Sequence, residues 1–250
     1  TDVIHLAALQ VPACKANPPV GGRVNVVGTI NVFEAARRLG LPRIVYASSV
    51  AVYGPSEDYE SPLLTHDAPL KPRTLYGATK QMNEATARIY RWDHGLSSIG
   101  LRPYVIYGPG RDQGMTSSPT KAMLAAAAGR AYHISYGGRF GMQYADDVAN
   151  LFIAAARAPF EGAEAYNIQG NVVHMREVVA AIEAAAPEVE NTITFESQSL
   201  PFPDGQEDER LRELLGDLDY TPLEEGVATC IATFREALTD GRLSVRDITG

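Results

Sequence analysis

The chain has 250 residues, of which 45% are hydrophobic and 21% are charged, a composition typical of a folded globular protein. Its formal net charge of -8 argues against a nucleic-acid partner, because phosphate backbones are bound by basic surfaces. No apolar run reaches the roughly 20 residues that a membrane helix needs, and no signal peptide precedes Thr1, so the sequence predicts a soluble, cytoplasmic protein without a membrane partner.

Short apolar runs alternate with segments of helical periodicity along the first two thirds of the chain. Strands are predicted at residues 3–7, 43–47, 98–107 and 165–168. Helices are predicted at residues 24–39, 76–90 and 145–156. Strands separated by helices of this length indicate βαβ units, and therefore a parallel sheet with helices on both faces.

The last third of the chain has a different pattern. Helices are predicted at residues 174–186 and 222–238, and a short strand at 192–196. The acidic stretch FPDGQEDER, residues 202–210, is predicted to be a solvated loop and helix start. The long loops at residues 54–73 and 108–120 are expected to be functional, because loops of this length are uncommon in compact domains.

The stretch TLYGATK, residues 74–80, contains the strongest candidates for chemistry. Tyr76 and Lys80 lie four residues apart in a predicted helix, so both side chains are on one face. Lowering the pKa of a tyrosine from about 10 to near neutrality takes about 4 kcal/mol. An ammonium group about 4 Å away supplies a similar amount at an effective dielectric constant of about 20.

Two serines provide a second set of candidates. Ser48 and Ser49 follow the predicted strand at 43–47, at the edge where open α/β sheets bind ligands. A serine that holds a substrate oxygen and a tyrosine that exchanges its proton form an acid–base site. Together these residues predict the interconversion of an alcohol and a carbonyl.

The cysteines and histidines give no sign of a metal site. Cys14 and Cys230 are far apart and are expected to be small buried residues in a reducing compartment. The five histidines have no partners at metal-ligand spacing, so no metal site is predicted.

Six motifs occur in an order that points to a known family. They are HLAA (5–8), NVVGTINVFEAAR (25–37), SSVAVYG (48–54), YGATK (76–80), LRPYVIYGPG (101–110) and QYADDVA (143–149). In these motifs the chain resembles the short-chain dehydrogenase/reductases, in their extended branch of NAD-dependent epimerases and dehydratases. The resemblance implies an α/β fold: a Rossmann-type doubly wound parallel sheet, with its N-terminal strands missing, and a smaller C-terminal substrate-binding α/β region. The dinucleotide-binding part is expected at residues 1–106 and 141–168, and the substrate-binding region at 107–140 and 169–250.

The resemblance also implies roles for individual residues. Tyr76 corresponds to the catalytic base, Lys80 to the residue that binds the ribose and lowers the tyrosine pKa, and Ser49 to the catalytic serine. The expected cofactor is NAD or NADP, with NAD favoured by the resemblance, and the expected partners are a small-molecule substrate and a second copy in a homodimer. The dimer contact is expected to be formed by helices 24–39 and 76–90. The residues expected to bind the cofactor are Leu6, Ala7, Ala8, Asn25, Ser48, Tyr76, Lys80, Pro103 and Val105.

One family feature is not found in the sequence. The family begins with a strand and a G-x-x-G-x-x-G turn that binds the pyrophosphate, whereas Gly21–Gly22 and the GPG at 108–110 follow the wrong strands. Roughly the first third of the cofactor domain is therefore expected to be missing. Either the sequence is part of a longer chain, or it is a truncated product that binds a dinucleotide poorly.

Three positions depart from the pattern of nucleotide-sugar epimerases. Val105 stands where an asparagine is usual, Phe140 where an arginine is usual, and Gln10 where a lysine is often found. These changes argue against a nucleotide-diphosphate sugar, although Arg139 is a candidate substitute for the arginine. The polar stretch at 111–123 is expected to be a substrate lid, or else a solvated loop in which Ser118 or Thr120 caps the next helix. The expected substrate contacts are Gln10, Ser49, Met115, Thr116, Thr120 and Arg139.

The predicted function is that of an NAD(P)-dependent epimerase, dehydratase or dehydrogenase acting on a sugar, sugar nucleotide or related polyol. One alternative is a reductase or dehydrogenase of a small carbonyl substrate that is not a nucleotide. A second is a dinucleotide-sensing protein without catalysis, which is disfavoured because such relatives lose the tyrosine or the lysine.

Overall fold

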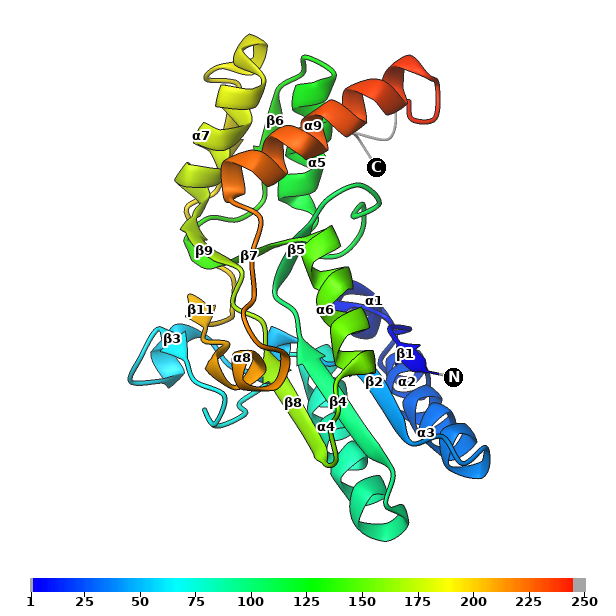
Figure 1. Ribbon diagram of the computed structural model, residues 1–250. Coiled ribbons are helices and arrows are strands. Elements are labelled where there is room, and N and C mark those ends of the chain that lie inside the picture. Colours follow the sequence, from blue (N-terminus) through cyan, green and yellow to red (C-terminus); the bar gives the residue numbers. More distant parts are fainter. Residues whose placement is uncertain (1, 245–250) are drawn as a thin grey trace. The chain divides into compact units, whose positions relative to one another are not determined.

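The computed structural model describes residues 2–244, which form two compact units (Figure 1). The first unit contains the chain up to Tyr104, together with Val148–Gln169 and Pro201–Leu218. The second contains Val105–Asp147, Gly170–Leu200 and the described chain from Asp219 on. The assignment of one part to the dinucleotide and the other to the substrate stays a prediction.

The first unit is built on a four-stranded parallel sheet. Its strands are β1 (Val3–His5), β2 (Arg43–Ala47), β4 (Ser97–Arg102) and β8 (Ala163–Asn167), in the order β1-β2-β4-β8. Every neighbouring pair is parallel, which confirms the predicted Rossmann-type sheet. The carboxyl ends of all four strands therefore meet at one edge.

Helices connect β1 to β2 over more of the chain than the sequence predicted. The helical segment expected to begin at residue 24 begins instead with α1 (Val11–Ala16) and α2 (Pro18–Gly22). A π-helical turn, Arg23–Val27, then leads into α3 (Gly28–Arg38). The prolines of this segment argue against a helix in the sequence. In the structure each lies in the first turn of its helix, where the missing N–H breaks no hydrogen bond.

Helix α4 (Leu75–His94) is longer at both ends than the predicted 76–90. It begins where the Thr74 hydroxyl accepts a hydrogen bond from the Gly77 amide, and it ends at Gly95, whose φ of 70° suits glycine. Helices α3 and α4 pack on one face of the sheet. The buried cluster between them consists of Phe33, Ala36, Ile44, Tyr46, Ala87 and Leu96. Helix α6 (Ala145–Arg157) lies across the other face in Figure 1.

The single strand predicted at 98–107 was wrong. The chain leaves the parallel sheet after Arg102, and β5 (Val105–Tyr107) belongs to a different sheet in the second unit. Pro103 lies at the break, where it has no N–H to donate to a strand ladder.

The loop at 54–73 and the segment from 201 to 218 lie in the first unit. The loop carries the 3₁₀ turn Ser56–Asp58 and strand β3 (Leu63–Leu64), which pairs with β11 (Gly205–Gln206). Helix α8 (Glu209–Leu215) follows. The acidic stretch thus leads into a helix as predicted, but it is not a solvated loop, because Gln206 and Asp208 are buried.

The second unit contains a three-stranded sheet and three long helices. The sheet has the order β5-β7-β9, with β7 at Arg139–Tyr144 and β9 at Asn171–His174. Helices α7 (Met175–Ala185) and α9 (Leu223–Thr239) were predicted within one residue at either end. Strands β6 (Tyr132–Ile134) and β10 (Ile193–Phe195) form a separate parallel pair.

The polar stretch at 111–123 is not a loop throughout. Helix α5 (Ser118–Ala127) begins inside it, with Ser117 as the N-cap residue and no side-chain capping bond. The Ser118 hydroxyl accepts from the Ser135 amide instead, so neither Ser118 nor Thr120 caps this helix. Over the described residues, no helix is both long enough and apolar enough to cross a membrane.

Candidate active site

The carboxyl edge of the parallel sheet brings together three of the predicted segments. The pairing of β2 with β4 continues past the strand ends, because the Ser48 amide donates to Leu101 at 2.7 Å and the Val50 amide to Pro103 at 2.9 Å. The segment after β1, which contains Leu6, Ala7 and Ala8, leaves the same edge. This is the edge where open α/β sheets bind their ligands.

Asn25 fixes the segment that follows β1. Its side-chain oxygen accepts from the Leu9 amide at 2.7 Å, and its amide nitrogen donates to the Leu9 carbonyl at 2.9 Å. The same nitrogen donates to the Thr79 hydroxyl on α4 at 3.2 Å. Asn25 lies in the π-helical turn and is fully buried, so its amide ties the end of β1 to α4.

The Lys80 ammonium group is buried at the carboxyl edge of the sheet. The side chain is 3% exposed, and Nζ donates to the Ala47 carbonyl at 2.7 Å, at the end of β2. Nζ also lies 5.6 Å from the centre of the Tyr76 ring, so the predicted tyrosine–lysine pair is brought together. Burial lowers the pKa of Lys80 to about 8. The positive charge of Lys80 also acts on His5 in β1. The pKa of His5 is lowered mainly by burial and, to a smaller extent, by repulsion from Lys80.

Burying this ammonium group costs stability, which gives a testable pH dependence. The folded pKa of Lys80 lies below the usual 10.5, so between these values the unfolded chain holds more protons, and stability rises with pH through that window. Lys80→Met should remove that rise. It should also raise the free energy of unfolding near neutral pH by roughly 2 kcal/mol. This is the cost of burying the charge, which the variant avoids, minus the contribution of the hydrogen bond to Ala47, which it loses. Urea unfolding of both proteins at about pH 7 and about pH 10 measures this; equal pH slopes would contradict it.

Ser49 lies on a tight turn between β2 and α4. It is the N-cap residue of the 3₁₀ turn Val50–Val52, and its hydroxyl oxygen accepts from the Ala51 amide at 3.2 Å. Because that oxygen acts as acceptor, the hydroxyl proton remains available for donation. The turn presses against the start of α4: a Cβ on Gly77 would come within 2.0 Å of the Ala51 carbonyl oxygen. Ser48 differs from Ser49, because its hydroxyl donates to Glu84 at 2.5 Å.

The donors at this edge fit a bound dinucleotide. The Lys80 ammonium has three N–H groups, and the Ala47 carbonyl is its one hydrogen-bond acceptor among the described residues. Ribose hydroxyls are acceptors of the right kind for the others. Leu6, directly after β1, is 57% exposed and offers an apolar contact at the same edge of the sheet.

The remaining predicted residues belong to the second unit or to neighbouring turns. Val105 is fully buried in β5, and Arg139 is exposed at the start of β7. The Thr116 hydroxyl accepts from Arg111 at 2.9 Å, and Thr120 is buried in α5. Their roles stay predictions, as do those of Met115, Pro103 and Gln10, the last of which is the N-cap residue of α1.

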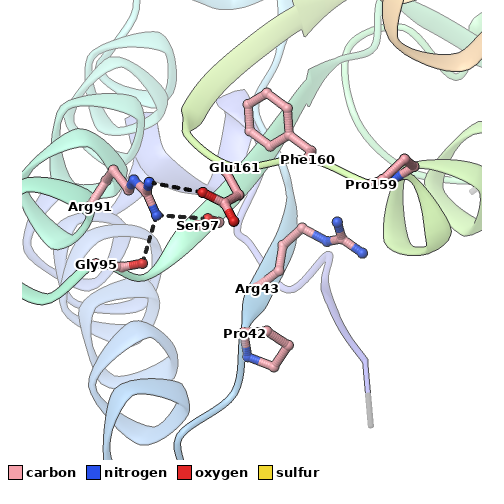
Figure 2. A pocket seen from close by; sticks show the side chains of 8 residues that line it. All are labelled: Pro42, Arg43, Arg91, Gly95, Ser97, Pro159, Phe160 and Glu161. Atoms are coloured by element: carbon pink, nitrogen blue, oxygen red, sulfur yellow. Dashed lines mark hydrogen bonds and ion pairs between the residues drawn. The ribbon is translucent and has the colours of Figure 1, made fainter.

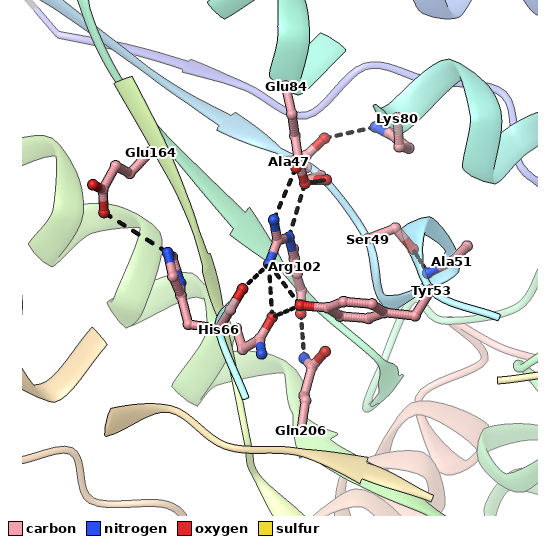
Figure 3. A network of polar contacts seen from close by, with 12 residues as sticks. Ala47, Ser49, Ala51, Tyr53, His66, Lys80, Glu84, Arg102, Glu164 and Gln206 are labelled. Carbon is pink, nitrogen blue, oxygen red and sulfur yellow. Dashed lines mark hydrogen bonds and ion pairs between the residues drawn. The ribbon is translucent and has the colours of Figure 1, made fainter. Parts of the chain in front are cut away.

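Sequence reasoning missed a buried polar network behind the site (Figure 3). Its centre is an ion pair between Glu84 of α4 and Arg102 of β4, with side chains 1% and 6% exposed. The sequence signals pointed to burial of each charge but not to its partner: Glu84 lies four residues after Lys80 on the same helix face, and Arg102 ends a buried strand. A charge in a buried strand needs a partner.

A pocket lies at the opposite ends of the strands (Figure 2). Its lining includes Arg43, the first residue of β2, and Ser97, the first residue of β4. Both of its arginines are already bound: Arg43 donates to the Ala156 and Ala158 carbonyls, and Arg91 to Gly95 and Ser97. Figure 2 shows Arg91 directed at Gly95, Ser97 and Glu161, whose carboxylate lies 3.7 Å from it.

Neither cysteine forms a disulfide, and both are buried, as expected. Within residues 2–244 no three side chains of the metal-binding types come together.

Comparison with known proteins identifies a matching family model and similar curated proteins. The model of the NAD dependent epimerase/dehydratase family matches residues 1–169. UDP-glucose 4-epimerase of Mycolicibacterium smegmatis is 32% identical over 250 residues, which cover 93% of this chain and 75% of the relative.

Solved structures with similar folds include a threonine dehydrogenase and a protein in complex with a UDP-sugar. A GalE-like L-threonine dehydrogenase from Cupriavidus necator superposes with a TM-score of 0.83 and 26% identity, covering 93% of this chain and 78% of that one. MoeE5 in complex with UDP-glucuronic acid and NAD superposes with a TM-score of 0.79 and 28% identity, covering 95% and 80%.

Proposed function

Since the chain belongs to the NAD-dependent epimerase/dehydratase family, we propose that it is an NAD-dependent sugar-nucleotide epimerase whose acid–base residue is Tyr76. The observation that carries the assignment is the position of the Lys80 ammonium group, which binds the end of β2 at Ala47 and lies 5.6 Å from the Tyr76 ring. A cation beside a phenol stabilises its ionised form, which is the form that takes a proton from a hydroxyl.

Three side chains carry the chemistry in this proposal. Ser49 donates a hydrogen bond from its hydroxyl to the substrate oxygen and so orients it, since its own oxygen accepts from the Ala51 amide. Tyr76 takes the proton of the substrate hydroxyl and returns it. Lys80 holds the ribose hydroxyls and keeps a positive charge beside Tyr76. NAD held at this edge by the backbone after β1 and by Lys80 would supply the hydride acceptor and donor for the carbon that bears this hydroxyl.

The cofactor is held by the backbone after β1 and by the ends of β2 and β4. Leu6, Ala7 and Ala8 line this edge, and Asn25 acts indirectly by fixing Leu9. Pro103 and Val105 follow β4 and are assigned to contacts with the nicotinamide ring of the cofactor. Gln10, Met115, Thr116, Thr120 and Arg139 are assigned to the substrate.

Two relatives define the substrate classes to be tested. The M. smegmatis relative named UDP-glucose 4-epimerase favours a UDP-sugar. The second candidate is a dehydrogenase of a small amino alcohol, favoured by the L-threonine dehydrogenase structure and by Gln10, Val105 and Phe140, which differ from the usual sugar-nucleotide residues. Both reactions begin with removal of a proton and a hydride from a secondary alcohol.

The experiment incubates the purified protein with NAD and UDP-glucose and follows inversion at C4 by proton NMR. A parallel reaction contains L-threonine and NAD and is followed by NADH absorbance. Inversion without accumulation of NADH is the expected result. NADH formed from L-threonine, with no inversion of UDP-glucose, would favour the second candidate. Neither product, with no NAD bound in native mass spectrometry, would contradict both.

We infer that two copies of the chain associate through α4 and the helical segment before α3. Seven large apolar side chains of these helices are exposed: Val20, Val24, Val27, Leu75, Met82, Ile89 and Trp92. Those of α4 recur at helical spacing on one face, and a grouped apolar surface of this kind marks a protein–protein contact.

Light scattering at micromolar concentration is expected to give twice the chain mass of 27.0 kDa. Ile89→Glu should give the monomer, because it would place a charge in the contact without touching the core. Exposed Glu57, which lies outside these helices, provides a matched control as Glu57→Gln. A monomer in the unmodified protein would contradict the inference.

A further inference from the structure

Two side chains of helix α4 form hydrogen bonds with two successive residues at the end of β2. Lys80 donates to the Ala47 carbonyl at 2.7 Å, and Glu84, one turn later, accepts from the Ser48 hydroxyl at 2.5 Å. The next residue of the chain is Ser49. The helix face that carries Tyr76 is therefore connected to the serine turn through neighbouring side chains, and Figure 3 shows Lys80 and Glu84 both directed at this strand end.

The carboxylate of Glu84 is held in place by Arg102. Arg102 Nε and Nη2 donate to the two carboxylate oxygens of Glu84, each at 2.9 Å, and both side chains are buried. A bidentate pair of this kind fixes orientation as well as distance. The Ser48 hydroxyl therefore binds an oxygen that cannot turn away from it.

Arg102 also holds the far end of the serine turn. Its Nη1 donates to the Tyr53 hydroxyl at 2.6 Å, and that hydroxyl donates to Asn167 of β8 at 2.9 Å. Tyr53 directly follows the 3₁₀ turn that Ser49 caps. In the middle of the turn, the Ala51 carbonyl packs where Gly77 has no Cβ. The turn is thus fixed at its beginning, middle and end.

We propose that the Glu84–Arg102 pair positions the Ser49 hydroxyl relative to Tyr76 and Lys80, with the Ser48 hydroxyl as the connecting group. Glu84, Arg102 and Ser48 are positioning residues, which do not contact the substrate. The proposal rests on the proposed function of Ser49 and Tyr76. Removing the Ser48 hydroxyl should loosen the turn while the fold remains, because Glu84 keeps both hydrogen bonds from Arg102.

The test compares Ser48→Ala with Ser98→Ala. Ser98 lies in the neighbouring strand β4, is fully buried, and its hydroxyl has no hydrogen-bond partner among the described residues. Ser48→Ala should lower kcat for UDP-glucose epimerisation about 10- to 100-fold, as expected when a catalytic group moves by about 1 Å. The KM should change less than about threefold, because the lost positioning acts mainly on the transition state. Ser98→Ala should match the unmodified protein, and Ser48→Thr, which keeps the hydroxyl, should restore much of kcat.

Hydrogen exchange measured by mass spectrometry provides a second result that needs no substrate. Ser48→Ala should speed amide exchange in residues 49–53, whereas Ser98→Ala should not. Unchanged kcat and unchanged exchange in Ser48→Ala, or equal losses in both variants, would overturn the proposal. If the unmodified protein does not turn over UDP-glucose, the proposed function fails. Faster exchange confined to Ser48→Ala would then still support the positioning link, and unchanged exchange would refute it.

Discussion

Tyr76→Phe is expected to lower turnover about 10³-fold, since a positioned acid–base group contributes on the order of 10² to 10⁴. Phenylalanine keeps the ring beside Lys80 but has no hydroxyl that could take or return the substrate proton. Tyr76 is half-buried in the first turn of α4, so the change removes little packing, and the stability should remain within about 0.5 kcal/mol.

The measurement is kcat for the substrate identified by the NMR and NADH assays, with a thermal melt of each variant. Tyr90→Phe is the matched control, because Tyr90 lies on the same helix, and within residues 2–244 its hydroxyl makes only a long hydrogen bond of 3.4 Å to Glu34. That variant should keep nearly normal turnover. A Tyr76→Phe protein that retains most of its activity would end the assignment of Tyr76 as the acid–base residue.

Arg102→Met is expected to destabilise the first unit by about 3 to 5 kcal/mol, the usual cost of leaving one member of a buried ion pair without its partner. Glu84 would keep one hydrogen bond, from Ser48, and its charge would remain in the interior. The Tyr53 and Asn167 side chains would also lose a donor. Urea unfolding measures the loss.

The double variant Glu84→Leu with Arg102→Met separates charge from packing. Because it removes both charges and keeps apolar volume, it should regain a large part of the stability lost in Arg102→Met. Its turnover should nevertheless stay low, since nothing then holds the Ser48 hydroxyl. A double variant as unstable as Arg102→Met would mean that the pair contributes through packing and not through charge neutralisation.

The sequence determined the elements whose signals are local. Apolar periodicity predicted α4, α6, α7 and α9, although it ended α4 at residue 90 and the helix continues to His94. The alternation of strands and helices predicted the parallel sheet, and motif order identified the family. Each of these signals depends on residues within a few turns of one another, so it can be read without knowing the rest of the fold.

The tertiary structure decided what depends on distant residues. Ser48, Glu84 and Arg102 lie 36 and 18 residues apart, and no local pattern indicated that the three would meet. The break between β4 and β5 was missed although Pro103 marks it, because the residues on either side favour a strand and do not reveal which sheet each half joins. Burial of a charge is favourable only when its partner arrives from another strand or helix, and that pairing exists only once the chain has folded.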